Sequence, residues 1–190
     1  MDTLPFRDVE FKPGNWKYEN IKFVYEKGIM TGIKGDEFLP DAPLTRAQFA
    51  SVIYRMAGLP QVTYRNIFTD VPARKWYSDA VVWAYEHGIA AGFGEGCYGI
   101  DYFITREQMA RMLMEFARTQ GYDIGAREDF GKFADVDQVS GWAAENMQWA
   151  VASGIISGSV KDGKYYMNPK SQATRAECAV MLTKFMKEHE

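Results

Sequence analysis

The chain has 190 residues, of which 47% are hydrophobic and 15% aromatic, and its net charge of −3 comes from well-mixed acidic and basic residues. This composition is typical of a globular protein and excludes the strongly basic footprint of a nucleic-acid-binding domain. There is no run of about 18 apolar residues to insert into a membrane, and two cysteines and two histidines predict no disulfide scaffold, cofactor, metal site or catalytic pair.

The same succession of motifs occurs three times, at a spacing of about 60 to 69 residues. A Phe-x-Asp-Val motif opens each unit, and a Thr-Arg-x-(Gln/Glu) motif opens its second half. Such repetition indicates a repeated structure and a repeated site. One unit alone would bury a meagre core, so we predict that residues 1–59, 60–123 and 124–190 are three repeats of one folded body.

The first half of each unit predicts a helix that begins near a tryptophan. Apolar residues follow at helical spacing, and a glycine then marks the left-handed end of the helix. A second glycine, four residues later, predicts a tight turn. The tryptophans are Trp16, Trp76 and Trp142, and the second glycines are Gly32, Gly92 and Gly158. Tryptophan rings can line a sugar-binding groove, but these helix-start positions favour the core, as do the mid-helix positions of Trp83 and Trp149.

A loop with an aromatic residue leads from the second glycine to the next motif. The aromatic is Phe38 in unit one, Tyr98 in unit two, and Tyr165 or Tyr166 in unit three. The loop of unit three is the longest of the three.

The second helix of each unit is expected to start at the threonine. Threonine at the N-cap with Gln or Glu three residues later is a capping box. The pairs are Thr45 with Gln48, Thr105 with Gln108, and Thr174 with Glu177. Large apolar residues then recur with helical periodicity, with an alanine beside them, and Cys178 occupies one of these places. The three stripes predict a pseudo-threefold helical bundle with Cys178 in its core, while Cys97 is expected to be a free thiol in a loop.

An arginine at the first position of each second helix runs against the helix dipole. These residues are Arg46, Arg106 and Arg175. One explanation is a bound anion, because unpaired N–H groups at a helix start and an arginine fork both favour a carboxylate. The other is an internal ion pair with the recurring Asp8, Asp70 and Asp135. If the anion explanation holds, we expect the arginines to be exposed and to matter far more for binding than for stability.

The order Phe-x-Asp-Val, Trp, Gly-Ile-x-x-Gly, turn and Thr-Arg-Ala-Glu resembles the S-layer homology domain, in three copies over nearly the whole chain. The resemblance implies a mainly α fold, a spindle of three helix-loop-helix repeats around a central three-helix bundle. It also implies non-covalent anchoring of a larger exoprotein to the bacterial cell wall. The implied ligand is a secondary cell-wall polysaccharide carrying pyruvate ketals, bound in grooves between neighbouring repeats. Gln48, Gln108 and Ala173 depart from the family pattern.

The expected function is therefore that of a glycan-binding anchor at the extracellular bacterial surface. The candidate glycan-binding residues recur once in each unit. They are the capping threonine, the Gln or Glu three residues after it, the motif arginine, the tryptophan, the aspartate and the second glycine. In full, they are Thr45, Thr105, Thr174, Gln48, Gln108, Glu177, Arg46, Arg106, Arg175, Trp16, Trp76, Trp142, Asp8, Asp70, Asp135, Gly32, Gly92 and Gly158. An assembly module that binds another protein in the same grooves is the alternative. A hydrolase is disfavoured, because no acidic pair recurs at catalytic spacing.

Overall fold

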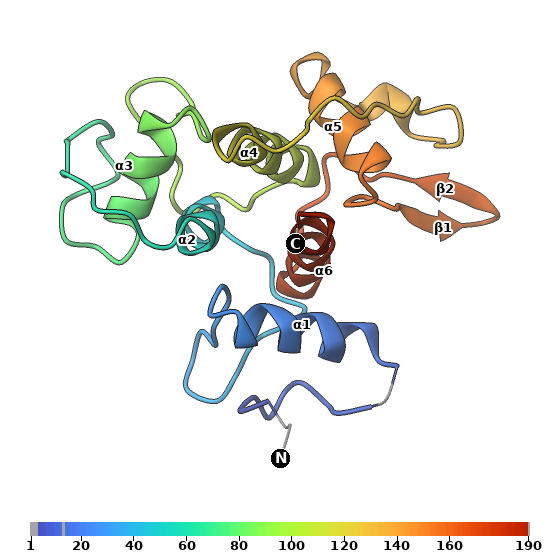
Figure 1. Cartoon of the computed structure of the whole chain (residues 1–190), viewed down its shortest axis with the longest axis horizontal. Helices are drawn as coiled ribbons and strands as arrows, with labels where there is room; N and C mark the ends of the chain where they lie inside the picture. Colours follow the sequence, from blue (N-terminus) through green and yellow to red (C-terminus); the bar gives the residue numbers. More distant parts are fainter. Residues whose placement is uncertain (1–3, 13, 190) are drawn as a thin grey trace.

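The computed structural model describes residues 4–12 and 14–189, and it confirms a mainly α protein (Figure 1). Each unit supplies two α-helices, and unit three adds two 3₁₀ helices and a small hairpin. The elements are α1 (Trp16–Glu26), α2 (Arg46–Met56), α3 (Ser78–Glu86), α4 (Arg106–Thr119), η1 (Val136–Gln138), η2 (Gly141–Ala143), α5 (Ala144–Ala152), β1 (Ser159–Lys161), β2 (Lys164–Tyr166) and α6 (Arg175–Glu188). The hairpin accommodates the longer loop of unit three. The symmetry of the spindle stays a prediction.

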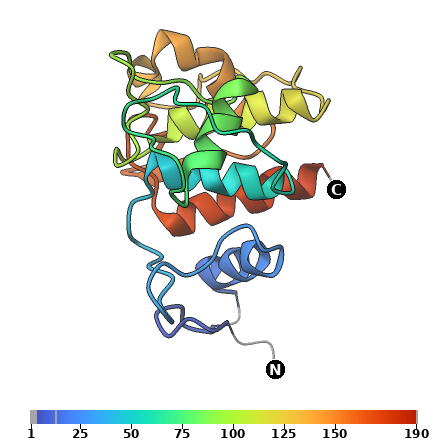
Figure 2. The ribbon, with the colours of Figure 1, turned by 90° about the vertical axis from the view of Figure 1, so that its left-hand side faces the viewer.

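The second helices, α2, α4 and α6, lie in the middle of the molecule, and the first helices lie around them (Figure 1). Each first helix packs on the second helix of the preceding unit: α3 contacts α2, and α5 contacts α4. Helix α1 has no preceding unit, and it packs against α6 from the far end of the chain (Figures 1 and 2). The first and third units are therefore in direct contact.

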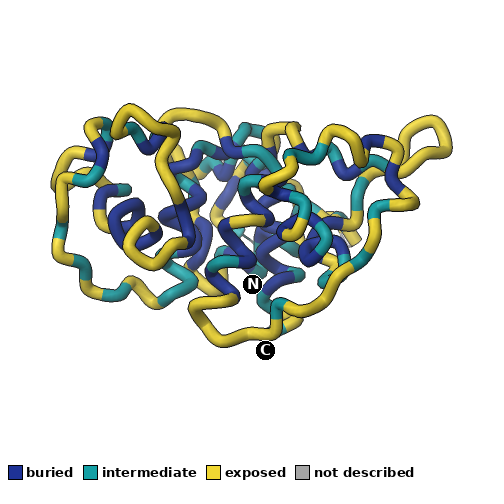
Figure 3. Tube along the Cα trace, turned by 90° about the horizontal axis from the view of Figure 1, so that it is seen from above, coloured by how far each residue is buried: buried dark blue, intermediate teal, exposed yellow. Residues whose placement is uncertain are grey.

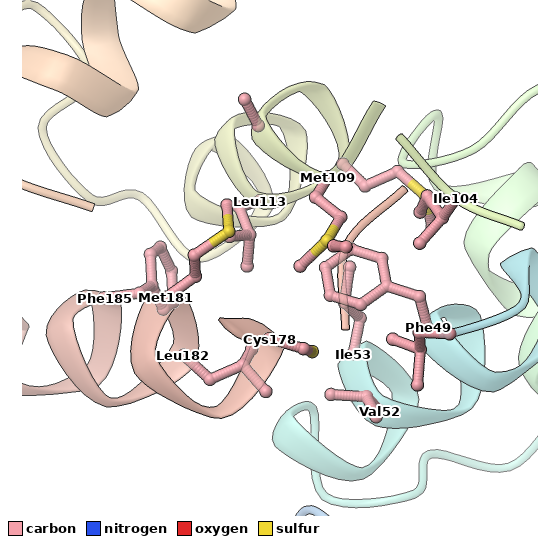
Figure 4. Packing of buried hydrophobic residues seen from close by; sticks show 14 of the residues in the cluster. Phe49, Val52, Ile53, Ile104, Met109, Leu113, Cys178, Met181, Leu182 and Phe185 are labelled. Atoms are coloured by element: carbon pink, nitrogen blue, oxygen red, sulfur yellow. The ribbon is translucent and has the colours of Figure 1, made fainter. Parts of the chain in front are cut away.

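The apolar stripes of the three central helices meet as the sequence predicts. Phe49, Met109 and Cys178 stand at equivalent places and are fully buried, and Figure 4 shows the stripes pointing toward one another. The alanines beside the stripes, Ala50, Ala110 and Ala179, are buried as well, which permits close helix contact. Figure 3 shows this buried centre surrounded by exposed loops. Trp83 and Trp149 are also in the core, as expected.

A ring of backbone hydrogen bonds ties the three units together just before the central helices begin. The amide of Leu44 donates to the oxygen of Ala173, that of Ala173 to Ile104, and that of Ile104 back to Leu44, over 2.9 to 3.1 Å. Because these bonds use only the backbone, the smaller Ala173 takes its place in the ring beside the larger Leu44 and Ile104.

The second glycines are required by close packing. A Cβ atom on Gly92 would lie 2.6 Å from the ring of Phe68, which opens the same unit. Likewise, a Cβ atom on Gly32 would lie 2.9 Å from the ring of Phe6, and one on Gly158 would lie 2.8 Å from the ring of Phe133. Of the three, only Gly158 has the positive φ that a tight-turn glycine was expected to show.

The loop aromatics of the three units differ in burial. Phe38 and Tyr98 are fully buried, whereas the equivalent buried residue in unit three is Met167. Tyr165 lies on strand β2 and is 48% exposed. The three-residue strands of the hairpin displace the aromatic pair outward.

Candidate functional site

Three grooves lie at the boundaries between units, and each has one motif arginine and one tryptophan in its wall. Groove 1 has a volume of about 240 Å³ and includes Arg46 and Trp142. Groove 2, of about 290 Å³, includes Arg175 and Trp76. Groove 3 consists of two adjoining hollows of about 260 and 180 Å³ that share Arg106, and Trp16 lines the larger one.

Each groove is assembled from all three units. In groove 1 the arginine comes from unit one, and the loop around Gly92 and the face of α4 come from unit two. The tryptophan of this groove, Trp142, comes from unit three. In groove 2 the arginine comes from unit three, the loop and helix face from unit one, and the tryptophan from unit two. In groove 3 the arginine comes from unit two, the loop and helix face from unit three, and the tryptophan from unit one. A single isolated unit therefore cannot form a groove.

The three tryptophans are exposed, and the prediction that they belong to the core is wrong. Trp16 and Trp142 are 50% exposed and Trp76 is 65% exposed. The inward places of the first helices belong to later residues, for example Ile21 and Val24 in α1. Half-exposed indole rings in a groove wall are suited to stack on the apolar face of a sugar.

The motif arginines differ from the sequence prediction in both exposure and partner. Arg46 is 6% exposed and Arg175 is 4% exposed. Arg46 donates from Nε to the oxygen of Tyr98 at 3.1 Å and from Nη2 to that of Ala91 at 2.7 Å. Arg175 donates from Nε to the backbone oxygen of Phe38 at 2.7 Å and from Nη2 to that of Thr31 at 2.6 Å. The arginines thus fasten one unit to the loop of the next through backbone carbonyl groups.

Aromatic rings flank these guanidinium groups. That of Arg46 lies 4.4 Å from the ring centre of Phe93 and 4.6 Å from that of Tyr98. Burial lowers the pKa of both Arg46 and Arg175, the latter to about 10. Within the described part of the chain, Nη1 of each makes no hydrogen bond, and both side chains line a groove. A ligand can therefore still use this part of the fork.

The helix starts do not offer the free N–H groups that the anion argument assumed. The amides of Arg46 and Ala47 donate to the oxygens of Tyr102 and Ile100 in unit two. The amides at the starts of α4 and α6 donate likewise to neighbouring loops. The next amide is bound by the capping threonine, because Thr45, Thr105 and Thr174 all form the expected capping box. Anion recognition in the grooves must therefore come from side chains.

The three aspartates bind backbone amides, so the alternative that pairs them with the arginines is wrong. Asp70 accepts hydrogen bonds from the amides of Tyr98 and Gly99 at 2.7 Å and of Ile100 at 3.2 Å. Asp8 and Asp135 hold the equivalent loop amides of their own units. Burial alone would raise the pKa of Asp70, but these hydrogen bonds outweigh it and lower the pKa.

The remaining candidates divide into two groups. Gly32, Gly92, Gly158, Gln48, Gln108 and Glu177 line the grooves. The described residues that line the grooves include neither the capping threonines nor the aspartates. These residues support the grooves from behind the lining. The threonines fix the start of each central helix, and the aspartates fix the loop that forms part of each groove wall.

A second cation lines each groove, and the sequence analysis missed it. Arg111 joins Arg46 in groove 1, Arg55 joins Arg175 in groove 2, and Lys184 joins Arg106 in groove 3. Arg55 and Lys184 both stand ten residues after their capping threonine, whereas Arg111 stands six after its own. The signal available in the sequence was the cation ten residues after the threonine in units one and three. In unit two Glu115 occupies that position, so the recurrence is incomplete.

These features define a class of protein: a three-repeat module whose binding grooves combine two cations with an exposed indole and exist only when the repeats assemble. The model of the S-layer homology domain matches residues 5–50, 67–110 and 132–179, and the chain belongs to this family.

The relatives are long surface proteins and polysaccharide-degrading enzymes. The chain is 30% identical to an amylopullulanase of Thermoanaerobacterium thermosulfurigenes, over 93% of this chain and 9% of the relative. It is 28% identical to the surface-layer 125 kDa protein of Lysinibacillus sphaericus, over 91% and 14%. It is 30% identical to an endoglucanase of Bacillus sp. strain KSM-635, over 96% and 19%. The chain thus spans less than a fifth of each of these relatives.

The chain is an anchoring module of the kind found in larger surface proteins, and it is not an enzyme. The similarity to enzymes covers only a minor part of each. Among the described residues, no helix has the length and apolar character needed to span a membrane.

Proposed function

We propose that this module anchors an exoprotein on the extracellular bacterial surface by binding an anionic secondary cell-wall polysaccharide, with the pyruvate ketal as the group recognised. The observation that carries the proposal is the composition of the grooves. Each contains two cations from different helices and one half-exposed tryptophan, so that a carboxylate and a sugar face can be bound together.

The shape of a pyruvate ketal suits this arrangement. Its carboxylate is fixed on the sugar ring, so that charge and apolar face are presented at a constant separation. In groove 1, the guanidinium of Arg111 lies 5.7 Å from the ring centre of Trp142, and Arg46 lines the same groove. Binding energy is expected from the charge-assisted hydrogen bonds and from ring stacking.

The first test is a pull-down of the purified module with cell-wall sacculi, before and after extraction of the non-peptidoglycan polymer. The module should sediment with intact sacculi and remain in solution with extracted ones. Binding that survives extraction would favour peptidoglycan or a protein receptor, the latter being the assembly function considered as the alternative.

The second test uses calorimetric titration with pyruvylated glycan. The double variant Trp76→Ala, Trp142→Ala removes two exposed rings. Stacking on an aromatic side chain contributes about 1–3 kcal/mol per nucleobase. We expect a loss of similar order for a sugar face, so the affinity should fall about tenfold or more. Phe11→Ala is the matched control, because Phe11 is 58% exposed and lies outside the grooves. Equal affinity of the double variant and the control would exclude grooves 1 and 2 as the binding site.

A further inference from the structure

Unit two carries a pair of exposed aromatic rings at the edge of groove 1. Phe93 follows the second glycine of its unit and lines groove 1, and Tyr102 stands three residues before the capping threonine. Their ring centres lie 5.3 Å apart with the ring planes at 69°, which is an edge-to-face contact. Phe93 is 51% exposed and Tyr102 is 61% exposed. We call these two residues the aromatic platform.

The other two units have no aromatic residue at either place. The residues that stand there are small or aliphatic: Ile33 and Ala42 in unit one, and Ser159 and Ser171 in unit three. Units one and three nevertheless form the same pair of helices as unit two. The fold therefore does not require the aromatic platform, and exposed aromatic side chains that gather at one place commonly mark a binding surface.

A glycine that is particular to unit two makes room for the aromatic platform. A Cβ atom on Gly99 would lie 2.8 Å from the ring of Tyr102 and 2.9 Å from that of Phe93. The backbone conformation alone does not demand glycine here. Gly99 has a φ of +80°, but Leu39 and Asn168 occupy the equivalent positions with φ of +58° and +53°. Three positions of unit two thus depart together from the other units, and together they build one surface.

Backbone hydrogen bonds hold the aromatic platform beside the motif arginine of groove 1. The amide of Arg46 donates to the backbone oxygen of Tyr102 at 2.9 Å, and the amide of Tyr102 donates to that of Gly99 at 3.2 Å across a turn. The guanidinium of Arg46 lies 4.4 Å from the ring centre of Phe93. Phe93 therefore joins the cation of groove 1 to the platform. A surface that is already in place loses little conformational entropy when a ligand binds.

We propose that the aromatic platform is a second sugar subsite, which binds the uncharged sugar residue next to the ketal-bearing residue in groove 1. This inference rests on the proposed function and adds the length of glycan that one groove recognises. The apolar face of the second sugar stacks on the exposed rings, and the hydroxyl group of Tyr102 hydrogen-bonds to a sugar hydroxyl group. Grooves 2 and 3 have no such platform, because their loops come from units one and three. These two grooves therefore recognise the ketal-bearing residue alone.

The chain provides one tryptophan reporter for each groove, so the affinity of each groove can be measured separately. Trp142, Trp76 and Trp16 line grooves 1, 2 and 3, while the remaining two tryptophans, Trp83 and Trp149, are buried in the core. Labelling with 5-fluorotryptophan gives five fluorine NMR signals, which can be assigned by single Trp→Phe variants. The first probe is the methyl glycoside of N-acetylmannosamine with a 4,6-linked pyruvate ketal. The second probe is the disaccharide in which this residue is joined by a β-1,4 bond to the methyl glycoside of N-acetylglucosamine.

In the parent protein we expect groove 1 to bind the disaccharide about tenfold more tightly than the monosaccharide, an effect of the order of one stacked ring. Grooves 2 and 3 should bind the two probes with nearly equal affinity. Tyr102→Ala, which introduces the residue of unit one, should lower the affinity of groove 1 for the disaccharide to that for the monosaccharide. Tyr102→Phe keeps the ring and should retain most of the preference. Tyr165→Ala is the matched control, because Tyr165 is 48% exposed and stands outside the described lining of the grooves.

Two results would overturn the inference while leaving the proposed function intact. One is a parent protein in which groove 1 shows no preference for the disaccharide although the monosaccharide shifts a groove signal, which would assign the platform to a protein partner instead. The other is a Tyr102→Ala variant, with an unchanged melting temperature, in which the preference persists or both probes weaken equally. If neither probe moves the signal of Trp142, Trp76 or Trp16, both the inference and the proposed function are wrong.

Discussion

Nη2 of Arg175 donates a hydrogen bond to the backbone oxygen of Thr31 at 2.6 Å, across 144 residues of sequence. Arg175 opens the last helix of the chain, and Thr31 lies in the first loop between helices. The same contact recurs between Arg46 and Ala91. An arginine that runs against the helix dipole is thus explained by the carbonyl groups of the adjoining unit.

The alanine variants of these arginines should be less stable than the parent. In Arg46→Ala and Arg175→Ala, two carbonyl oxygens each lose a charged donor in a sheltered place, which costs about 1.5 to 3 kcal/mol. For a chain of this size we expect a melting temperature lower by roughly 3 to 12 °C in calorimetry. Arg7→Ala is the control, since the side chain of Arg7 is 66% exposed and pairs with Asp36 and Glu37 at the surface. Melting of all three variants at the parent temperature would contradict this role.

Gly92→Ala should destabilise the fold through overpacking. The new methyl group would lie 2.6 Å from the Phe68 ring and 2.7 Å from the oxygen of Cys97, so ring or loop must move. Such strain costs about 1 to 3 kcal/mol, which urea unfolding would measure. At Gly141 an added methyl group meets nothing within 4 Å. Gly141→Ala should therefore be neutral or slightly stabilising, and an equal loss in both variants would rule out the packing explanation.

Asp70 should make the protein sensitive to acid. Its pKa is lowered in the folded state, so its contribution to stability is present above the unfolded pKa of about 3.9 and is lost as the pH falls through the folded value. In Asp70→Asn the free energy of unfolding should be lower than in the parent at pH 7, and the difference should shrink below pH 4. Denaturant titrations at both pH values test this. A difference that is the same at pH 7 and pH 3 would show that the charge has no part in it.

Deletion of residues 124–190 should leave a poorly packed protein. It removes α6, against which α1 packs, and it exposes the apolar stripes of α2 and α4. We expect a broad thermal transition and binding of a hydrophobic dye, because the remaining units share one core. A truncated chain with a sharp transition at the parent temperature would mean that the repeats fold independently.

The sequence predicted the elements well because their signals are local. The capping boxes, the glycine helix ends and the stripe through Phe49, Met109 and Cys178 all depend on spacing within one helix. Repetition along the chain also identified the motif arginines as a recurring feature. These signals say what each unit contains, and they do not say which unit contacts which.

The errors concern partners that have no sequence signature. Every residue has a backbone carbonyl, so nothing in the sequence marks Ala91 or Thr31 as the acceptor of an arginine. The outward position of Trp142 follows from the exact start of α5 at Ala144, which spacing alone does not give. The second cation escaped notice because Arg111 does not share the position of Arg55.

The contact between α1 and α6 has a consequence for synthesis of the protein on the ribosome. Helix α1 is the first described helix to emerge, and its partner α6 is the last. Until α6 has left the exit tunnel, the apolar face of α1, with Ile21 and Val24, has nothing to cover it. Groove 2, which needs Arg175, cannot exist before then either. A chain terminated before α6 therefore lacks groove 2 and leaves the apolar face of α1 open to chaperones and proteases.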